Sequence, residues 1–457
     1  MEPRDPSRRP AHGMRTFFSM WFGQLVSLLG SQLTGFALGV WVYDQTHSVS
    51  MLAVTQIAMQ VPYVVLSPLA GVLADRWNRR TAMIVSDFGA GLAILAAGVL
   101  FISGYLQPWM VIPINLWMAA FQTLMWPSFS AATTLLVPKE HYGRASGFTQ
   151  LGEALPAIAG PAIAGMLYVT IRVGNMALLD FSSYVFAVLL MLLFVRIPNP
   201  VPTLEATSLK SSLWHEMSVG WDYIMTRRGL LSLLIFFMIF NFLSGVIGPL
   251  IVPLILDNWD AATLGYLSTL MGVGMLAGTL VMSAWGGGKR KIYTMLGGFL
   301  LDGLFLAAVC LRVSVPLLAV CGFGAMFCSP ITNAASQAIW QAKVAPDLQG
   351  RVFAFRRAIA MSAGLLAPLL AAPLADFVFK PAMAPGGLLI PWLGPIIGVG
   401  AGKGTGVMIS LVGLIIVATT LIALSVPQLR RVEVDLPDYA PPLDADRRSS
   451  ALSEAAG

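Results

Sequence analysis

The sequence Gly71-Val72-Leu73-Ala74-Asp75-Arg76-Trp77-Asn78-Arg79-Arg80 separates two long apolar runs. Residues 51–70, before it, contain no Asp, Glu, Lys or Arg, and residues 81–109, after it, contain only Asp87. Each run reaches the ~20 residues that an α-helix needs to cross a bilayer. Three arginines and one aspartate between two such runs must lie at a membrane surface, where basic residues mark the cytoplasmic side. The stretch therefore predicts a loop between two membrane-spanning helices.

The composition of the whole chain agrees with a protein embedded in a bilayer. Hydrophobic residues make up 57% of the 457 residues and charged residues 11%, whereas soluble domains carry roughly 25% charge. The net charge of +6 does not indicate nucleic-acid binding, because the cations lie in the connectors between apolar runs. The three cysteines lie in apolar runs and are odd in number, so we expect packing residues rather than a disulfide framework. We expect no metal and no cofactor, and an enzyme is the least favoured class.

Twelve apolar segments are long enough to cross a membrane. The predicted spans are 16–42, 51–74, 81–103, 109–136, 146–170, 176–195, 230–256, 262–285, 291–311, 315–342, 351–378 and 405–427. Of the 28 Lys and Arg residues, 22 lie in the tails and alternate connectors, four lie in the other connectors, and Arg356 and Arg357 lie inside the eleventh span. Because Lys and Arg favour the cytoplasmic side, both termini are predicted to be cytoplasmic, which requires an even number of spans.

The chain repeats itself, which predicts two halves of six spans each. The residues that recur after an offset of 207 are Val137, Glu140, Gly143, Arg144, Phe148 and Pro161, matched by Val344, Asp347, Gly350, Arg351, Phe355 and Pro368. The predicted organisation is a disordered tail 1–15, an N-terminal half 16–195, a cytoplasmic linker 196–229, a C-terminal half 230–427 with an external loop 380–404, and a disordered tail 428–457.

The charged stretch resembles the loop between helices 2 and 3 of major facilitator superfamily transporters. The usual pattern there is Gly-x-Leu-Ala-Asp-Arg-x-Gly-Arg-Arg/Lys, and only Asn78, in place of the second glycine, departs from it. Asn adopts left-handed backbone more readily than other residues that carry a Cβ, so we expect the tight turn to be kept. The alternative is an ordinary basic loop that sets topology. The resemblance implies an all-α fold of twelve helices in two halves with a substrate site between them, and a gating loop formed by Gly71, Asp75, Arg76, Arg79 and Arg80.

The fifth span carries a second resemblance. The pattern Gly147-x8-Pro156-x3-Gly160-Pro161-x2-Ala164-Gly165 is similar to the antiporter signature of drug exporters in this superfamily, in which glycines stand at the places of Pro156 and Ala164. Gly147, Gly160, Pro161 and Gly165 match, and small residues allow helices to pack closely. Together with residues 73–80 and 350–353, this pattern resembles the group that contains enterobactin exporters and macrolide efflux pumps, which implies export.

Two carboxylates are candidates for proton coupling. Glu153 lies nine residues after Arg144, or ~14 Å along a helix, near the centre of a ~30 Å hydrocarbon core. A carboxylate at that depth must face a cavity, pair with a cation or hold a proton. It either couples transport to protons or serves as a structural acid. Asp75 is the second candidate: at the N-terminus of the eleventh span it would latch the halves together, and the alternative is a cap within its own loop.

Arg356 or Arg357 could bind an anionic substrate, pair with Glu153, or serve topology. For Asp87 and Asp302, which occupy corresponding places in the two halves, we expect structural hydrogen bonds. Polar and aromatic residues on the spans predict the lining of a cavity, and for each of them a hydrogen bond between helices is the alternative. These residues are Gln24, Gln32, Gln56, Gln60, Asn115, Gln122, Trp126, Gln150, Asn241, Asn333, Gln337, Trp340, Gln341, Arg356 and Arg357.

These observations predict a secondary active efflux transporter, driven by proton antiport, that exports an amphipathic small molecule such as a siderophore, a peptide natural product or a macrolide. The expected partners are this substrate, protons and the lipid bilayer, without nucleic acid, and the protein is expected to be a monomer in the bacterial cytoplasmic membrane. A lysophospholipid flippase of the same fold is one alternative. A membrane receptor or scaffold that transports nothing is the other.

Overall fold

The computed structural model describes residues 13–138, 141–195, 197, 221–311, 313–344 and 346–436. Within these ranges it leaves out some side chains, among them those of Asp75, Arg76 and Arg357, and the surroundings of Gly71. This part of the chain is helical and contains no strand. The long helices are α1 (Gly13–Thr46), α2 (Val49–Arg76), α3 (Arg79–Ile102), α4 (Val111–Gln122), α5 (Met125–Leu136), α6 (Tyr142–Thr170), α7 (Val173–Phe194), α9 (Arg228–Leu256), α10 (Ala261–Trp285), α11 (Lys291–Ala308), α12 (Val315–Lys343), α13 (Pro346–Leu374) and α16 (Ala401–Ser425). The short ones are the 3-10 helix η1 (Pro108–Met110), the π-helical turn η3 (Ala375–Phe379), α14 (Lys380–Met383), α15 (Ile390–Ile397), α17 (Pro427–Arg430) and α18 (Val432–Asp435).

Eleven helices in the described residues are long and apolar enough to cross a membrane. The fourth predicted span is interrupted, because α4 ends at Gln122 and α5 begins at Met125. Pro127 explains the interruption: its ring clashes with the carbonyl four residues earlier, at Thr123, and it donates no hydrogen bond. At the end of α4 the backbone N–H and the hydroxyl of Thr123 both donate to the carbonyl of Ala119, at 3.0 and 2.7 Å. With α4 and α5 taken as one broken span, the fold has the twelve predicted spans.

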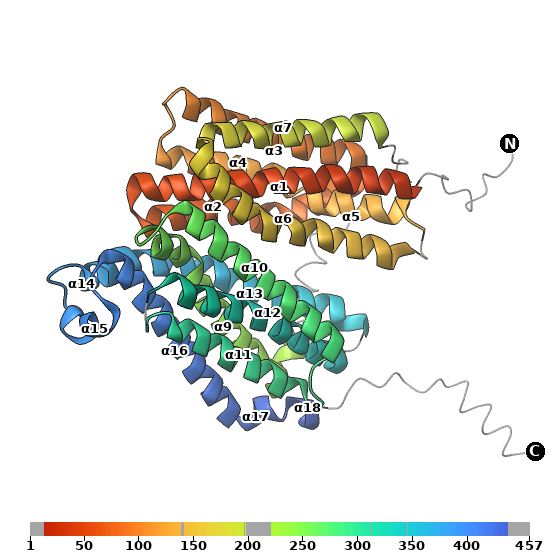
Figure 1. The fold of residues 1–457 in the computed structure, drawn as a ribbon. Coiled ribbons are helices and arrows are strands. Elements are labelled where there is room, and N and C mark those ends of the chain that lie inside the picture. Colours follow the sequence, from red (N-terminus) through yellow and green to blue (C-terminus); the bar gives the residue numbers. More distant parts are fainter. Residues whose placement is uncertain are drawn as a thin grey trace, which may run out of the picture.

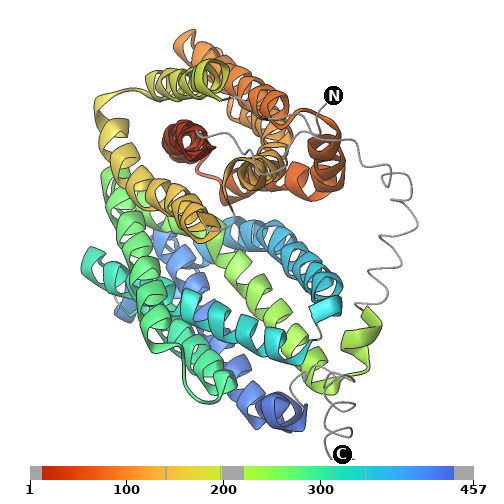
Figure 2. The same cartoon turned by 90° about the vertical axis from the view of Figure 1, so that its right-hand side faces the viewer.

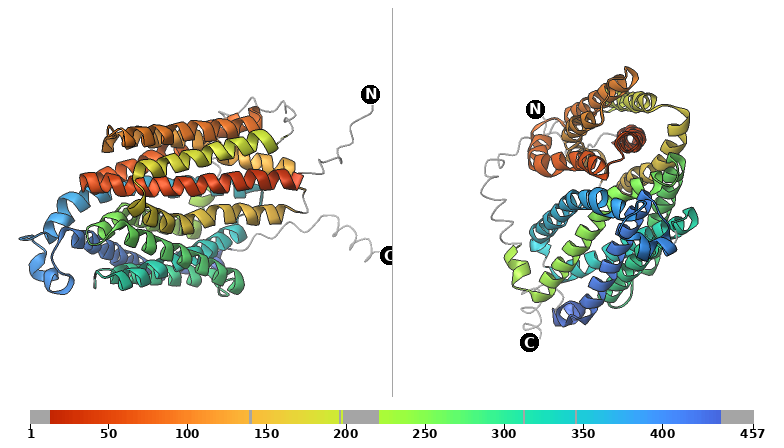
Figure 3. Two further views of the ribbon diagram at one scale, coloured as in Figure 1. Left: turned by 45° about the horizontal axis from the view of Figure 1, so that its top comes forward. Right: turned by 90° about the vertical axis from the view of Figure 1, so that its left-hand side faces the viewer.

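The helices form two bundles that lie side by side (Figure 1). The first contains α1 to α7, coloured red to yellow, and the second contains α9 to α16, coloured green to blue. In the left panel of Figure 3 the long helices run roughly parallel, with both termini at one end and α14 and α15 at the other. We call these the terminus end and the α14 end. The bundles contact each other mainly where α6 meets α10 and where α2 meets α13, and α9 also contacts both α1 and α2.

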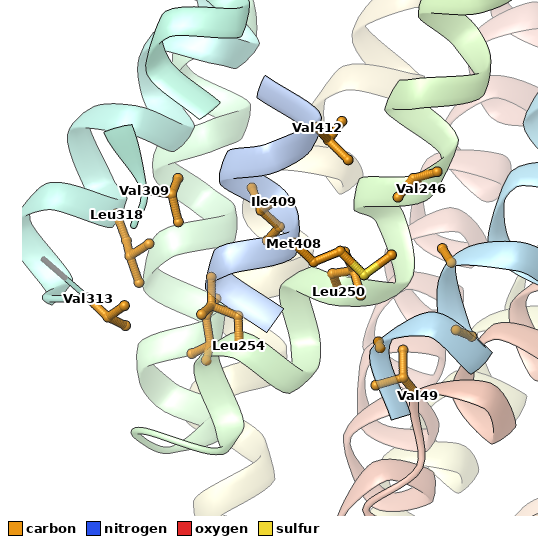
Figure 4. Packing of buried hydrophobic residues seen from close by; sticks show 14 of the residues in the cluster. Val49, Val246, Leu250, Leu254, Val309, Val313, Leu318, Met408, Ile409 and Val412 are labelled. Carbon is orange, nitrogen blue, oxygen red and sulfur yellow. The ribbon is translucent and has the colours of Figure 1, made fainter. Parts of the chain in front are cut away.

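Buried hydrophobic residues join the bundles at the α14 end. One cluster combines Val49 of α2 with Leu250 of α9 and Met408 of α16 (Figure 4). The other three clusters each belong to a single bundle, including the two that contain Phe17 of α1 and Ile224 before α9, near the terminus end. Figure 2 views the molecule from this end. The described core therefore holds the two halves together at the α14 end.

The segment after the last span is ordered where a disordered tail was expected. Both carboxylate oxygens of Glu433 accept hydrogen bonds from the first backbone N–H groups of α11, at Lys291 and Ile292, each at 3.0 Å. The buried ammonium of Lys343 donates to the backbone carbonyls of Glu433 and Leu436. The segment 427–436 thus caps one helix and accepts hydrogen bonds from a buried cation. The residues beyond it lie outside the described part.

Candidate functional site

Four of the predicted site residues line one cavity inside the N-terminal half. The cavity has a volume of about 190 Å³ and lies among α1, α2, α4, α5 and α6. Glu153 of α6 is exposed and lies on its wall with Gln24 of α1, Gln122 of α4 and Trp126 of α5. Trp21 closes another side, and its indole N–H donates to the backbone carbonyl of Phe148, at 2.6 Å. A carboxylate on a wall of tryptophan and amide side chains can exchange a proton and can meet an amphipathic ligand.

The amides of this half also bridge helices. Gln24 donates to the buried carboxylate of Asp87 at 2.8 Å, which confirms the structural hydrogen bond expected of Asp87. Gln122 donates to the hydroxyl of Tyr184 at 2.9 Å, and Asn115 donates to the backbone carbonyl of Thr55 at 2.9 Å. Asn115 and Gln56 also line a second cavity of about 200 Å³. These side chains therefore fix helices and line cavities at the same time.

A further set of predicted residues meets in the C-terminal half. Arg356 of α13 donates to the side-chain oxygens of Gln337, at 3.0 Å, and of Ser336, at 3.4 Å. Its guanidinium carbon lies 5.2 Å from the ring centroid of Trp340 and 5.4 Å from that of Phe237. Arg356 and Gln337 line a cavity of about 370 Å³ with Asn241 and Asn333. Trp340 is fully buried, so it packs against Arg356 and does not face the cavity.

Other predicted residues lie apart from these cavities or outside the description. Gln32, Gln60, Gln150 and Gln341 are exposed. The surroundings of Gly71 and the side chains of Asp75, Arg76 and Arg357 lie outside the described part of the chain, so the roles of these residues stay predictions.

The described part of the charged loop is a short connection between α2 and α3. The expected left-handed turn at Asn78 is wrong, because Asn78 has an extended backbone (φ −60°, ψ 123°) and its side chain accepts from the N–H of Arg80 at 2.9 Å. It is therefore the N-cap of α3. The Arg80 guanidinium donates to the backbone carbonyls of Met191 and Leu192, at 3.0 and 2.7 Å, and so ties α3 to the end of α7. The Nε and Nη1 atoms of Arg79 are buried, and no hydrogen bond joins them to another described residue.

The antiporter-like helix crosses the other half at two glycines. A Cβ atom added at Gly165 of α6 would lie 2.9 Å from the carbonyl oxygen of Ala261 and 3.1 Å from the Cα atom of Gly265. One added at Gly265 would lie 2.5 Å from the carbonyl oxygen of Pro161. A Cβ atom added at Gly160 would lie 2.7 Å from the Cβ atom of Gln32 of α1, whereas one added at Gly147 would have no heavy atom within 4 Å. The small residues of this helix thus bring the two bundles into backbone contact.

Six polar residues that sequence reasoning missed connect the halves at the α14 end. We call them the cross-half latch: Tyr43, Ser48 and Ser50 of the N-terminal half and Asp257, Asp376 and Lys380 of the C-terminal half. The only signal was an aspartate followed four residues later by a lysine at the end of an apolar run. The hydrogen bonds between the halves join residues that are 214 to 337 positions apart in the sequence, so no local pattern pairs them.

The carboxylate of Asp376 is the centre of the latch. It accepts from the hydroxyls of Ser48 and Ser50, at 3.0 and 2.8 Å, and from the backbone N–H groups of Val49 and Ser50, at 3.0 and 2.8 Å. An anion at the first turn of α2 also complements the positive end of that helix. Lys380 lies 3.4 Å from Asp376 and donates to the hydroxyl of Tyr43 at 2.8 Å, and this hydroxyl donates to Asp257 at 2.7 Å.

We expect Asp376→Ala to loosen the α14 end. A hydrogen bond to a charged group is worth roughly 1.5–3 kcal/mol, so the loss of even one favours the open state by about tenfold or more. The measurement is the rate at which a water-soluble maleimide labels Val40→Cys, in the buried cluster that joins the halves, in purified protein whose three native cysteines are replaced. Asp260→Ala is the matched control, because Asp260 caps α10 and bonds only Thr263 of its own half. Equal labelling rates in the two variants would refute a latch.

The comparisons with known proteins agree with this architecture. Residues 11–364 match the family model described as transmembrane secretion effector. Macrolide efflux protein A of Streptococcus pyogenes is 28% identical over 372 residues, covering 79% of this chain and 89% of that protein. The enterobactin exporter EntS of Shigella flexneri is 25% identical over 311 residues, covering 65% of this chain and 72% of that protein.

Solved structures share the fold at low sequence identity. A bacterial homologue of the human lysosomal transporter Spinster, solved in an inward-facing and unoccupied conformation, superposes with a TM-score of 0.70 at 12% identity, covering 95% of this chain and all of that one. The nucleoside transporter NupG, solved as a point mutant, gives a TM-score of 0.69 at 9% identity, covering 89% of this chain and 99% of that one.

Proposed function

Because this chain belongs to the transmembrane secretion effector family of the major facilitator superfamily, we propose that it exports an amphipathic small molecule in exchange for protons. That it is an efflux transporter of this superfamily follows from the family and from the relatives. Proton antiport and the class of substrate are the proposal. The names of these relatives, a macrolide efflux protein and an enterobactin exporter, support a macrolide or a siderophore as the first substrates to test.

The observation that carries the proposal is the position of Glu153. Its carboxylate lies on the wall of the N-terminal cavity, between tryptophan and amide side chains, on the helix whose glycines contact the other half. A group in this place can take up a proton from one side of the membrane when the halves open there. It can release the proton to the other side after the halves have moved. Uptake of the proton and release of the substrate then bias the same equilibrium between two states.

The state of the molecule supports alternating access. The latch and the shared hydrophobic cluster join the halves at the α14 end, and the hydrophobic clusters near the terminus end stay within their own halves. With the termini in the cytoplasm, as the distribution of Lys and Arg predicts, this arrangement is closed to the outside. Export then requires that the latch opens and that the halves close on the cytoplasmic side. We assign this cytoplasmic closure to Asp75 and its loop. The protein works as a monomer in the cytoplasmic membrane.

Arg356 favours one second candidate, the lysophospholipid flippase. Its guanidinium lies on the wall of a cavity with Phe237 and Ile359, and a guanidinium binds phosphate well. A lysophospholipid combines such a phosphate with an apolar chain. It therefore belongs among the substrates that are tested.

The proposed function is tested with inverted membrane vesicles in which a pH gradient, acidic inside, is imposed. Uptake of a labelled macrolide, a catechol siderophore and a lysophospholipid is measured with and without nigericin, which collapses the gradient. We expect uptake of one class to fall at least tenfold on addition of nigericin. Uptake of the lysophospholipid alone would favour the flippase, and uptake of no class above that of protein-free vesicles would refute the proposal.

A further inference from the structure

The C-terminal half contains a second and larger cavity, separate from the one at Glu153. Its volume is about 440 Å³, and it lies among α9, α10, α11, α12 and α16. Pockets that hold small molecules measure roughly 300–1,000 Å³, so the space is sufficient for one. It shares Phe237, Asn241 and Asn333 with the cavity at Arg356. The two cavities of this half therefore adjoin.

Asp302 of α11 is the one charged residue on the wall of this cavity. It is 7% exposed. In the described part of the chain no hydrogen bond or ion pair reaches its carboxylate. The structural hydrogen bond expected of Asp302 is therefore wrong, unlike that of Asp87, whose carboxylate receives Gln24. A buried carboxylate without a partner is costly, which makes it a candidate for binding.

The surroundings of Asp302 fit a cation. Phe299 lies three residues earlier on α11 and so shares its face. The ring centroid of Phe299 lies 4.0 Å from that of Phe240 and 5.5 Å from that of Phe237, and all three line the cavity. The faces of aromatic rings attract cations, most strongly where water is excluded. A positive group beside Asp302 would therefore meet both a carboxylate and ring faces.

The neutral polar groups of the wall offer acceptors as well. Asn241 and Asn333 each donate their side-chain nitrogen to a carbonyl of their own helix, at Phe237 and Ser329. Among the described residues no hydrogen bond reaches their side-chain oxygens, which can accept from a ligand. No Lys or Arg lies on the wall of this cavity. The wall presents hydrogen-bond acceptors and one carboxylate in an apolar space, which suits a lipophilic cation.

We propose that this cavity is a binding site for lipophilic cations, with Asp302 as the counter-ion and Phe237, Phe240 and Phe299 as the aromatic wall. The inference rests on the proposed export function, because it assigns the substrate class: an apolar body that carries a protonated amine or another cationic centre. Export of such a molecule would begin with its cationic group at Asp302 in the state that is closed at the α14 end.

The test is direct binding of radiolabelled tetraphenylphosphonium to the purified full-length chain, since the charge of this cation does not change with pH. We expect Asp302→Asn to weaken binding at least tenfold and Asp302→Glu to restore part of it. Triphenylphosphine oxide is a neutral molecule of similar shape. It should displace bound tetraphenylphosphonium equally well from wild type and from Asp302→Asn. Asp222→Asn is the matched control, because Asp222 is an exposed carboxylate just before α9 and is not on the wall of the cavity. It should bind like wild type.

A second variant guards against misfolding of Asp302→Asn. Ser244 lies on the wall, and Ser244→Phe should block the cavity while Asp302 is kept, so that both the cation and the neutral molecule lose binding. Unchanged binding of tetraphenylphosphonium by Asp302→Asn, or by Ser244→Phe, would overturn the site. Vesicle transport separates this result from the proposed function. If binding depends on Asp302 but no gradient-driven transport is measured, the site is kept and antiport is refuted. If gradient-driven transport is measured but Asp302→Asn binds like wild type, antiport is kept and the site is refuted.

Discussion

Glu153→Gln is expected to abolish transport driven by a pH gradient and to preserve exchange of substrate across the membrane. Glutamine keeps the size and the hydrogen-bonding capacity of the side chain on the wall of the N-terminal cavity but binds no proton. The halves can then still move with substrate bound, yet the gradient no longer biases that motion. We expect gradient-driven uptake to fall at least tenfold, whereas exchange of labelled for unlabelled substrate at equal pH stays within about twofold.

The measurement compares both modes in the same vesicles. Asp87→Asn is an instructive comparison, because Asp87 is fully buried and bonds Gln24. Its replacement should lower thermal stability and affect both modes alike. Glu153→Asp should retain part of the driven transport, because a carboxylate is kept. Driven transport that survives in Glu153→Gln would move the proton site away from Glu153, with Asp75 the next residue to replace.

Gly165→Leu is expected to reduce transport to the level of protein-free vesicles. A Cβ atom at this position meets the backbone of α10 at 2.9 and 3.1 Å, and backbone atoms cannot rotate away as a side chain can. Overpacking of this kind typically costs about 1–3 kcal/mol. Because α6 and α10 belong to different halves, the strain falls on the contact about which the halves must move. The side chain of Leu, being larger than a single Cβ, has to push the helices apart.

Gly147→Leu supplies the matched control on the same helix. A Cβ atom there has no heavy atom within 4 Å, so the variant should transport at close to the wild-type rate. Size-exclusion chromatography would establish that both variants are inserted and folded. Similar transport by the two variants would refute the role given to the crossing at Gly165 and Gly265. Loss of folding in Gly165→Leu alone would make the crossing a requirement of assembly, to be separated from motion with the milder Gly165→Ala.

The spans could be predicted from the sequence because their signal is local. A run of ~20 apolar residues ended by charged residues predicts a membrane helix wherever it stands, and the interruption at Thr123 needed only Pro127 to explain it. Asn78 was misjudged because two local effects compete there. Asn tolerates the left-handed region, but as an N-cap its side chain gains a hydrogen bond to the N–H of Arg80 in extended backbone.

The site residues could be predicted only by type. Gln24 and Asp87 are separated by 63 residues, and Ser48 and Asp376 by 328, so their contacts follow from the packing of helices and not from any pattern in the chain. Asp302 and Asp87 occupy equivalent places in the sequence, and only the packing leaves one of them bonded and the other on the wall of a cavity. Sequence thus indicated that buried acids mattered, and tertiary structure separated their roles.

The ordered segment after the last span has a consequence for biosynthesis. Glu433 caps α11, and the carbonyls of this segment accept from Lys343, so these contacts form only after the ribosome has delivered the last residues of the described chain. A chain that stops at residue 426 would carry every span but would lack the carboxylate that caps α11. A reporter domain for topology is therefore better fused after residue 436, where it leaves this cap intact.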